Sequence, residues 1–433
     1  MKTIKRDKTG MVLVIVLSIA LCLALLGLGM LQLGLGSRIM AAREVANISA
    51  RCAADSGLTH ALYSMNNLFV IGDPSNFEPP PDVIDRILKN MNATYSYQIE
   101  DQLTHPVTGK PYWLVESVGK MGSQQRTVYA MLGYRNLFDY GLIVTDKITL
   151  KSNTLVDGYD RSLGPYVYEE SPPYTNSHRH VRIGTTSIVE DSVWLGSDTE
   201  ITGDILVGIG GEVHNIITNP SGNAIIGNCY NLPEPVLFPQ IIPPSDYDIA
   251  MVLIGSDLSI EAPPGYTIEN PYTVLAESIS IGQGGSLTVV GNVAICVTGD
   301  MSFDQGAFLN VGDGTVISSL DIYLHGDLLG RQAGGINNLS QIPGYFKLLG
   351  TGEPYQQWDI HNSLEFHGVY YGPNADIIIR ADADIFGSVS GHSYDMKNSG
   401  FLHYDISLRD LSKYNTGFGI DRWWEKSDFI AAE

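Results

Sequence analysis

One long uncharged segment near the start of the sequence constrains the fold most. From Met11 to Ser37 there is no charged residue, and from Met11 to Leu31 almost every side chain is strongly apolar. A helix needs about 20 consecutive apolar residues to cross roughly 30 Å of hydrocarbon, and this segment is long enough. It therefore predicts a transmembrane helix.

The residues before this segment predict its orientation. Residues 1–10, MKTIKRDKTG, contain four cations, and Asp7 is their only acidic residue. Positive charge next to an apolar helix favours the cytoplasmic side, so we expect everything after Arg38 to be exported. The segment exceeds the roughly 7 to 15 apolar residues of a secretory signal, and no Ala-x-Ala cleavage site follows it. We expect a single-pass helix in the cytoplasmic (inner) membrane.

The helical pattern continues past the apolar segment. Apolar residues recur at three-, four- and six-residue intervals and keep one rough stripe, with charged residues on the other faces. The stripe consists of Ala41, Val45, Ile48, Cys52, Leu58, Leu62 and Met65. It predicts one helix over residues 11–66, roughly 84 Å long at 1.5 Å per residue, which exceeds what an anchor needs.

The basic residues 1–10, Gly10, Met11 and the long apolar helix resemble the class III signal of type IV pilins and type II secretion pseudopilins. In that family a prepilin peptidase cuts after the glycine and methylates the new amine, and the helix enters the filament core. The resemblance implies a leader at 1–10 and processing between Gly10 and Met11. It also implies three partners: the peptidase, membrane lipid and other pilin-like subunits.

A narrower resemblance is to the PilX-type N-terminal region of pilus assembly proteins. There a Gly-x-x-Leu-Val opening precedes an Ala-x-x-Gly-Leu-x-x-Ala stretch. The matching residues are Gly10, Leu13, Val14, Ala54, Gly57, Leu58 and Ala61. Ile15 departs from major pilins, which have a glutamate there that is thought to pair with a neighbour's terminal amine. Because a carboxylate in lipid is costly unless paired, Ile15 suggests the hypothesis of a minor, initiating or tip-associated subunit.

Residues 67–136 predict a small antiparallel sheet that packs on the C-terminal half of the helix. A Pro- and Gly-containing break over 68–81 precedes a short helical stretch near Val83–Asn92. Three apolar or alternating runs separated by turn residues then predict strands at Thr94–Ile99, Tyr112–Val118 and Gln125–Gly133.

Residues 137–410 predict a right-handed β-solenoid. The chain has 46 Gly and 23 Tyr with only 17% charged residues, which disfavours coiled coils and disorder. Strands of three to five residues that end at glycine or aspartate fit solenoid coils, and a β-sandwich is the alternative. The clearest strands are Ser278–Ile281, Ser286–Val290, Val293–Val297, Met301–Phe303 and Phe308–Val311. Two proline-rich stretches, Asn231–Pro244 and Ala262–Pro271, predict loops across the outer face. The fold class is thus mainly β with a long N-terminal α-helix.

Both ends of this body resemble the β-helical C-terminal domain that follows PilX-type N-termini. Phe138–Tyr166 resembles its start and Phe366–Asp405 its end. The recurring features of the end are matched by Phe366, Gly368, Tyr371, Pro373, Ala375 and the closing His403, Tyr404 and Asp405.

The tail, 411–433, contains Trp423, Trp424 and Phe429. We expect this cluster to cap the open end of the solenoid, which would otherwise expose unpaired strand edges. Cys229 and Cys296 have the option of pairing in an oxidising compartment, and the sequence leaves that open.

Few residues suggest chemistry. Asp300, Asp304 and Asp313 lie in neighbouring coils but at turn positions where aspartate bonds the local backbone. His178 and His180 lack a third metal ligand at typical spacing, which favours a solvated loop pair. Calcium-type turns at 208–212 and 311–314 are better explained as glycine corners. We therefore expect no catalytic, metal or cofactor residues.

Charge and helix together predict the function class. Asp+Glu 47 against Lys+Arg 26 gives −21, so nucleic acid is excluded as a partner. We expect a non-enzymatic minor pilin or pseudopilin that displays its body for adhesion, priming or spacing in a type IV pilus or type II secretion system. The alternatives are a membrane-tethered β-helix polysaccharide-active enzyme and a static envelope anchor.

Overall fold

The computed structural model describes residues 9–69, 77–89, 91–100, 102–104, 111–169, 171–331, 334–352, 355–361, 365–380, 384–411 and 414–426, with backbone only for 9–12. The leader residues before Thr9 and the predicted cap residue Phe429 lie outside this part. The chain forms two compact units. The helix–sheet unit comprises residues up to 70, 75–134 and 417 onward, and the ladder unit comprises 71–74 and 135–416.

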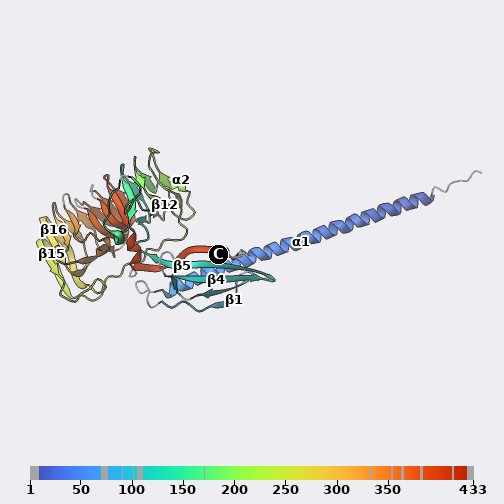
Figure 1. Ribbon diagram of the computed structural model, residues 1–433, viewed down its shortest axis with the longest axis horizontal. Coiled ribbons are helices and arrows are strands. Elements are labelled where there is room, and N and C mark those ends of the chain that lie inside the picture. Colours follow the sequence, from blue (N-terminus) through green and yellow to red (C-terminus); the bar gives the residue numbers. More distant parts are fainter. Residues whose placement is uncertain are drawn as a thin grey trace, which may run out of the picture. The chain divides into compact units, whose positions relative to one another are not determined.

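A single helix, α1 (Thr9–Leu68, 60 residues), dominates the helix–sheet unit, as expected (Figure 1). A six-stranded sheet joins it, with order β1-β2-β4-β5-β28 and β3 paired to β4. The strands β1, β2, β4 and β5 pair antiparallel. Their bounds are β1 Val83–Ile87, β2 Thr94–Ile99, β3 Leu103–Thr104, β4 Pro111–Met121, β5 Gln124–Asn136 and β28 Asn415–Glu425.

The three central strands confirm the predicted antiparallel sheet, but two other expectations were wrong. Val83–Ile87 is the strand β1 and not part of a helix, because its backbone completes the open edge of β2. Asn415–Glu425 does not cap the ladder unit. It is β28, next to β5, and the backbone bond from Lys426 N to Thr127 O (2.9 Å) extends this pairing.

The second part of α1 packs on the small sheet through small side chains. The buried face consists of Ala50, Ala53, Ala54, Leu58, Ala61 and Met65. The stripe correctly predicted that the helix continues, since all its residues lie in α1, but Leu58 and Met65 are buried whereas Ala41, Val45, Ile48 and Cys52 are exposed. The reason is close approach: a Cβ added to Gly119 of β4 would overlap the backbone of Ala50 and Ala54. Ser117 also donates to the Ala54 carbonyl at 2.7 Å.

Parallel strands stacked in rows build the ladder unit, a 22-stranded sheet. Its strands are β6 (Leu142–Val144), β7 (Ile148–Leu150), β8 (Leu155–Tyr159), β9 (Val181–Thr185), β10 (Val193–Leu195), β11 (Glu200–Ile201), β12 (Gly203–Val207), β13 (Ile217–Thr218), β14 (Cys229–Asn231), β15 (Ile249–Glu261), β16 (Tyr272–Val290), β17 (Asn292–Val297), β18 (Met301–Phe303), β19 (Phe308–Val311), β20 (Ser319–Leu324), β21 (Leu328–Gly330), β22 (Gly335–Asn338), β23 (Phe346–Gly350), β24 (Gln356–Ile360), β25 (Phe366–Ile379), β26 (Ile385–Met396) and β27 (Phe401–Asp405). The strands β17, β18 and β19 confirm three of the short strands predicted there, and β16 contains the other two.

Apolar side chains in register form the core of this unit. Val274, Ile295, Ile322 and Leu348 lie in consecutive rows, each paired with the next, and all four are buried. Stacking of this kind lets each row hide its inward side chains against the rows on either side. The residues that ended strands in the sequence, such as Gly312 with φ +93°, form the corners.

The chain enters the ladder unit between two rows and not at an end. The row β6–β8 pairs on one side with β9, β10 and β11, and on the other with β26 and β27. The chain builds rows outward to β14, and a proline-rich crossing segment, 232–248, leads to β15 at the opposite end (Figure 1). It then builds back until β26 and β27 meet the first row. We call the junction of first and last rows the seam.

Candidate functional site

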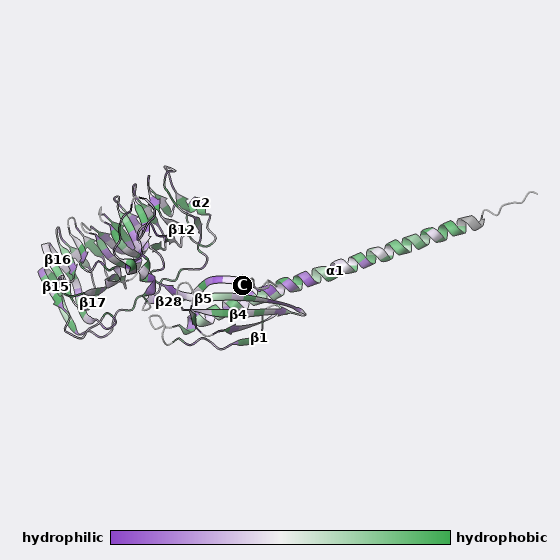
Figure 2. Ribbon diagram, viewed as in Figure 1, coloured by the Kyte–Doolittle hydropathy of each residue, from purple (hydrophilic) through white to green (hydrophobic). Residues whose placement is uncertain are grey.

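The first part of α1 presents an exposed surface that is almost entirely apolar up to Leu35. Leu13 and Leu33 are 69% and 76% exposed, and Figure 2 shows the apolar colouring of this stretch. The helix is long and apolar enough to cross a membrane, so it is compatible with a single-pass anchor. Gly10 and Met11, the predicted processing residues, fall within the first turns of α1. Ile15 belongs to the exposed surface.

The seam joins the two segments that carry the β-helical resemblance. His403 Nδ1 lies 2.6 Å from Asp157 Oδ1, and both side chains are buried. The other Asp157 oxygen accepts from the Tyr166 hydroxyl (3.1 Å) and the His178 amide (2.9 Å). Tyr404 donates to the Phe138 carbonyl at 2.5 Å, within the same seam. These bonds are structural, since each polar group has its partner within the fold.

Beside the seam lies a cavity of about 340 Å³, the seam cavity. Its lining residues are Tyr159, Arg161, Pro165, Tyr166, Tyr168, Gln341, Glu365, His367, Asp384 and Phe386. They come from both sides of the seam and from the turn before η3 (Pro343–Tyr345). These segments lie far apart in the sequence, so no sequence motif contains the residues that line the seam cavity.

Ionisable groups in the seam cavity are perturbed by burial. His367 is 8% exposed, and its ring stacks on Phe386 with centroids 4.5 Å apart. Its Nε2 lies 3.5 Å from a Glu365 oxygen, and neither ring nitrogen makes a hydrogen bond in the described structure. Burial lowers the pKa of His367 and raises the pKa of the Asp384 carboxyl. Burial thus disfavours the charged form of each group relative to the same group in water.

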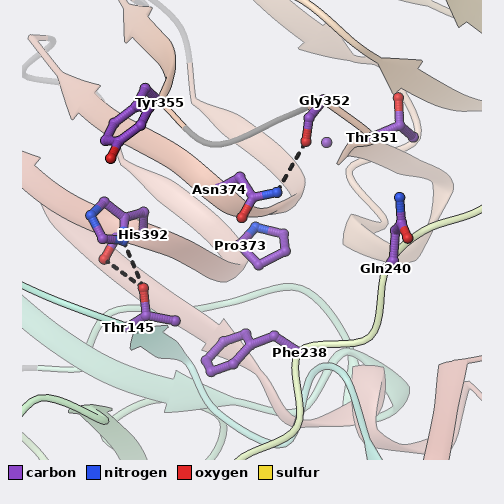
Figure 3. A pocket seen from close by; sticks show the side chains of 10 residues that line it. Thr145, Phe238, Gln240, Thr351, Gly352, Tyr355, Pro373, Asn374 and His392 are labelled. Carbon is purple, nitrogen blue, oxygen red and sulfur yellow. Dashed lines mark hydrogen bonds between the residues drawn. The ribbon is translucent and has the colours of Figure 1, made fainter.

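A second cavity, of about 700 Å³, lies along the crossing segment (Figure 3). Phe238 and Gln240 of that segment line it, together with Pro373 and Asn374 from β25. Among the described lining residues there is no carboxylate, lysine or arginine, and the His392 ring bonds to the Thr145 hydroxyl at 2.8 Å. The crossing segment is held to the ladder by Tyr371, whose hydroxyl donates to the Pro239 carbonyl at 2.9 Å. The remaining lining residues are Gly350, Thr351, Gly352 and Tyr355.

The structure separates His178 and His180, the pair with metal-ligand spacing. His178 is mostly buried and stacks on Tyr174 with ring centroids 4.3 Å apart, so it is not the solvated residue that we expected. His180 is exposed and lies 3.1 Å from Asp204. The described residues contain no group of three metal-binding side chains.

The three aspartates weighed as catalytic each have a different bond. Asp313 accepts from the Thr315 amide at 2.8 Å, the local turn bond that we expected. Asp300 instead accepts from Asp327 N of the next row at 2.9 Å, and Asp304 lies 3.6 Å from Arg331. All three stabilise turns or rows.

The cysteines are free in the structure. Cys229 lies on β14 and Cys296 on β17, near opposite ends of the ladder unit, so the optional disulfide does not form. Burial raises the pKa of the Cys296 thiol to about 11, which makes it a poor nucleophile at neutral pH.

Comparisons with known proteins give one partial family match. A family model described as a domain of unknown function (DUF7305) matches residues 274–411. No curated protein matches the chain. Among solved structures, the competence-associated pilin ComZ from Thermus thermophilus aligns over 88% of this chain and 97% of its own, with 13% identity and a TM-score of 0.28.

Proposed function

We propose that this chain is a minor pilin-like subunit that assembles or primes a type IV pilus or a type II secretion pseudopilus. The main support for this proposal is that the two parts of α1 have different surroundings. Its first part exposes apolar side chains, whereas Ala50 to Met65 fix the same helix to a folded sheet. Such a helix suits a subunit that leaves lipid and packs beside other apolar helices, because its apolar surface is continuous with an exported head.

The proposed partners follow from the same helix. Other pilin-like subunits pack against residues 13–37, membrane lipid holds that surface before assembly, and prepilin peptidase cuts between Gly10 and Met11. The basic leader keeps the N-terminus inside, and the body lies in the periplasm or on the cell surface. Ile15 supports a minor role, because it offers no carboxylate to a neighbour's amine.

The ladder unit is, in this proposal, a right-handed β-solenoid that is displayed for adhesion, priming or spacing and performs no catalysis. Parallel rows with a buried apolar ladder support the solenoid. The structural bonds of Asp300, Asp304 and Asp313 support the non-enzymatic role.

Intact-mass analysis of the native protein tests the proposal. We expect the chain to begin at Met11 with a methylated amine in cells with active prepilin peptidase, and to retain residues 1–10 in cells without it. Gly10→Val should block cleavage, and Thr9→Ala is the matched control. Retention of Met1 under all conditions would support a static envelope anchor instead.

A second assay addresses the tethered enzyme. The full chain in micelles is incubated with acidic polysaccharides, and we expect no depolymerisation. Cleavage that disappears on mutating one carboxylate would refute the structural role.

A further inference from the structure

The seam cavity combines buried polar groups that lack partners with an opening lined by aromatic and carboxyl side chains. The Nδ1 of His367 and the Nε of Arg161 are buried without a hydrogen bond in the described structure, and the Nε2 of His367 has only the 3.5 Å contact with Glu365. Buried polar groups in folded proteins are almost always bonded, and an unbonded one destabilises the fold. These groups therefore need partners that the cavity itself must admit.

We propose that the seam cavity binds one or two sugar rings of a neutral glycan. A sugar hydroxyl both donates and accepts, so it suits a wall that presents the Arg161 and His367 nitrogens beside the carboxyls of Glu365 and Asp384. A cavity of about 340 Å³ is at the small end of the range for ligand sites, which limits the occupant to a short stretch of glycan.

The aromatic side chains leave one ring for stacking. Phe386 is covered by His367 on one side and His403 on the other, with centroids 4.5 and 4.7 Å away. Tyr166 packs against His403 at 3.9 Å. Tyr168 packs beside His178, with ring centroids 5.7 Å apart, but is still 61% exposed, so part of its ring is available to the apolar C–H face of a sugar.

Charge selects neutral over acidic sugars. Among the described residues that line the cavity, Arg161 is the one permanent cation, and the exposed Glu365 carboxylate stands against it. The Glu365 side chain is 59% exposed at the cavity, where it would face an entering uronate or sialate. Like charges at a binding site disfavour the complex, so acidic glycans should bind more weakly. The inference does not depend on filament assembly, because it concerns the ladder unit alone.

The test uses the full chain in a detergent without a sugar headgroup, applied to an array of neutral hexose- and N-acetylhexosamine-terminated oligosaccharides beside uronate- and sialate-terminated ones. We expect retention by neutral glycans. Glu365→Gln and Tyr168→Ala, both at exposed positions, should weaken that binding at least tenfold. His367→Ala should abolish it, with circular dichroism to check folding. Tyr355→Ala, at the second cavity and 87% exposed, should leave it unchanged.

Three outcomes would overturn the inference. The first is that no glycan is retained, and the second is that acidic glycans bind as tightly as neutral ones. The third is loss of binding in Tyr355→Ala with no effect of Glu365→Gln and Tyr168→Ala, which would place the glycan in the second cavity.

Discussion

The two units are each closed by a segment from late in the chain, but the closures differ in chemistry. In the helix–sheet unit, β28 is held by aromatic packing and by Asn66, whose side chain bonds both the amide (2.7 Å) and carbonyl (3.1 Å) of Phe418. In the ladder unit, buried charged and polar groups around Asp157 join the last row to the first. The first closure also includes ion pairs of Glu425 with Arg51 and Arg126, which are partly exposed. Truncating its aromatic ring at Phe418 loses only that ring's contacts, whereas a change in the buried polar closure leaves the remaining partners unsatisfied.

The largest effect should follow removal of the seam carboxylate. Asp157→Ala leaves His403, the Tyr166 hydroxyl and the His178 amide without their acceptor, at a cost of about 5 kcal/mol. Hydrogen exchange on the full chain in micelles should show this loss in ladder-unit peptides and not in the small sheet. Asp304→Ala, at a half-exposed ion pair, is the control and should change exchange little. If Asp157→Ala and Asp304→Ala increased hydrogen exchange equally, the buried bonds of Asp157 would not be what stabilises the ladder unit.

Phe418→Ala should be the largest single loss in the helix–sheet unit. The ring is 4% exposed and lies 4.6 Å from Phe77 and 4.8 Å from Trp113, measured between centroids. Truncating such a ring costs about 4 kcal/mol, and denaturant unfolding followed by exchange of β5 and β28 measures it. Trp423→Ala, on the same strand but 42% exposed, should cost about 1 kcal/mol. A ladder-unit response to Phe418→Ala would show that the closures are coupled.

Gly119→Val tests the close approach of helix and sheet. The added side chain would push β4 from the backbone of Ala50 and Ala54, so we expect a loss of about 2 kcal/mol in the helix–sheet unit. Lys120→Val, the half-exposed neighbour on β4, is the control. Unchanged melting of Gly119→Val would mean that the helix does not rest on this strand.

The smallest effect depends on pH. Burial raises the folded-state pKa of Asp384 above 3.8, so the ladder unit loses stability as pH rises from 3.8 through the folded value. Asp384→Asn should therefore melt higher than the wild type at pH 7, with no difference below pH 3.8. Hydrogen bonds from Thr315 lower the pKa of Asp313, so Asp313→Asn should show the opposite sign. If the melting temperatures of Asp384→Asn and the wild type differed by the same amount at every pH, ionisation of the buried Asp384 carboxyl would not explain the difference.

The sequence predicted elements whose signal is local. The apolar run before Leu31 predicted α1, and turn residues around Tyr112–Val118 predicted the antiparallel strands. The buried face of the helix was partly missed, because alanine and glycine at 50, 53, 54 and 57 carry little hydrophobic signal although they allow close packing. The order of the rows could not be predicted from the sequence. The short apolar strands of each row can pair with several others, and no local signal specifies which pairing forms.

The seam cavity could not be predicted from the sequence either, because its residues come together only through the pairing of distant rows. His403 was noted within a closing motif, yet its partner Asp157 lies 246 residues earlier. Glu365, His367 and Asp384 show no spacing that indicates a site. Their proximity to Arg161 depends on the meeting of the first and last rows, which no local pattern encodes.

The mid-stack entry of the chain has a consequence for export. In the export of the body that we propose, the row containing Asp157 leaves the translocation pore early and must wait for His403, 246 residues later, before one of its two flanks is covered. Contacts of such long range form slowly, so the early rows pass through a period with an open strand edge. The nascent body should be most exposed to envelope proteases and in need of chaperones during that interval.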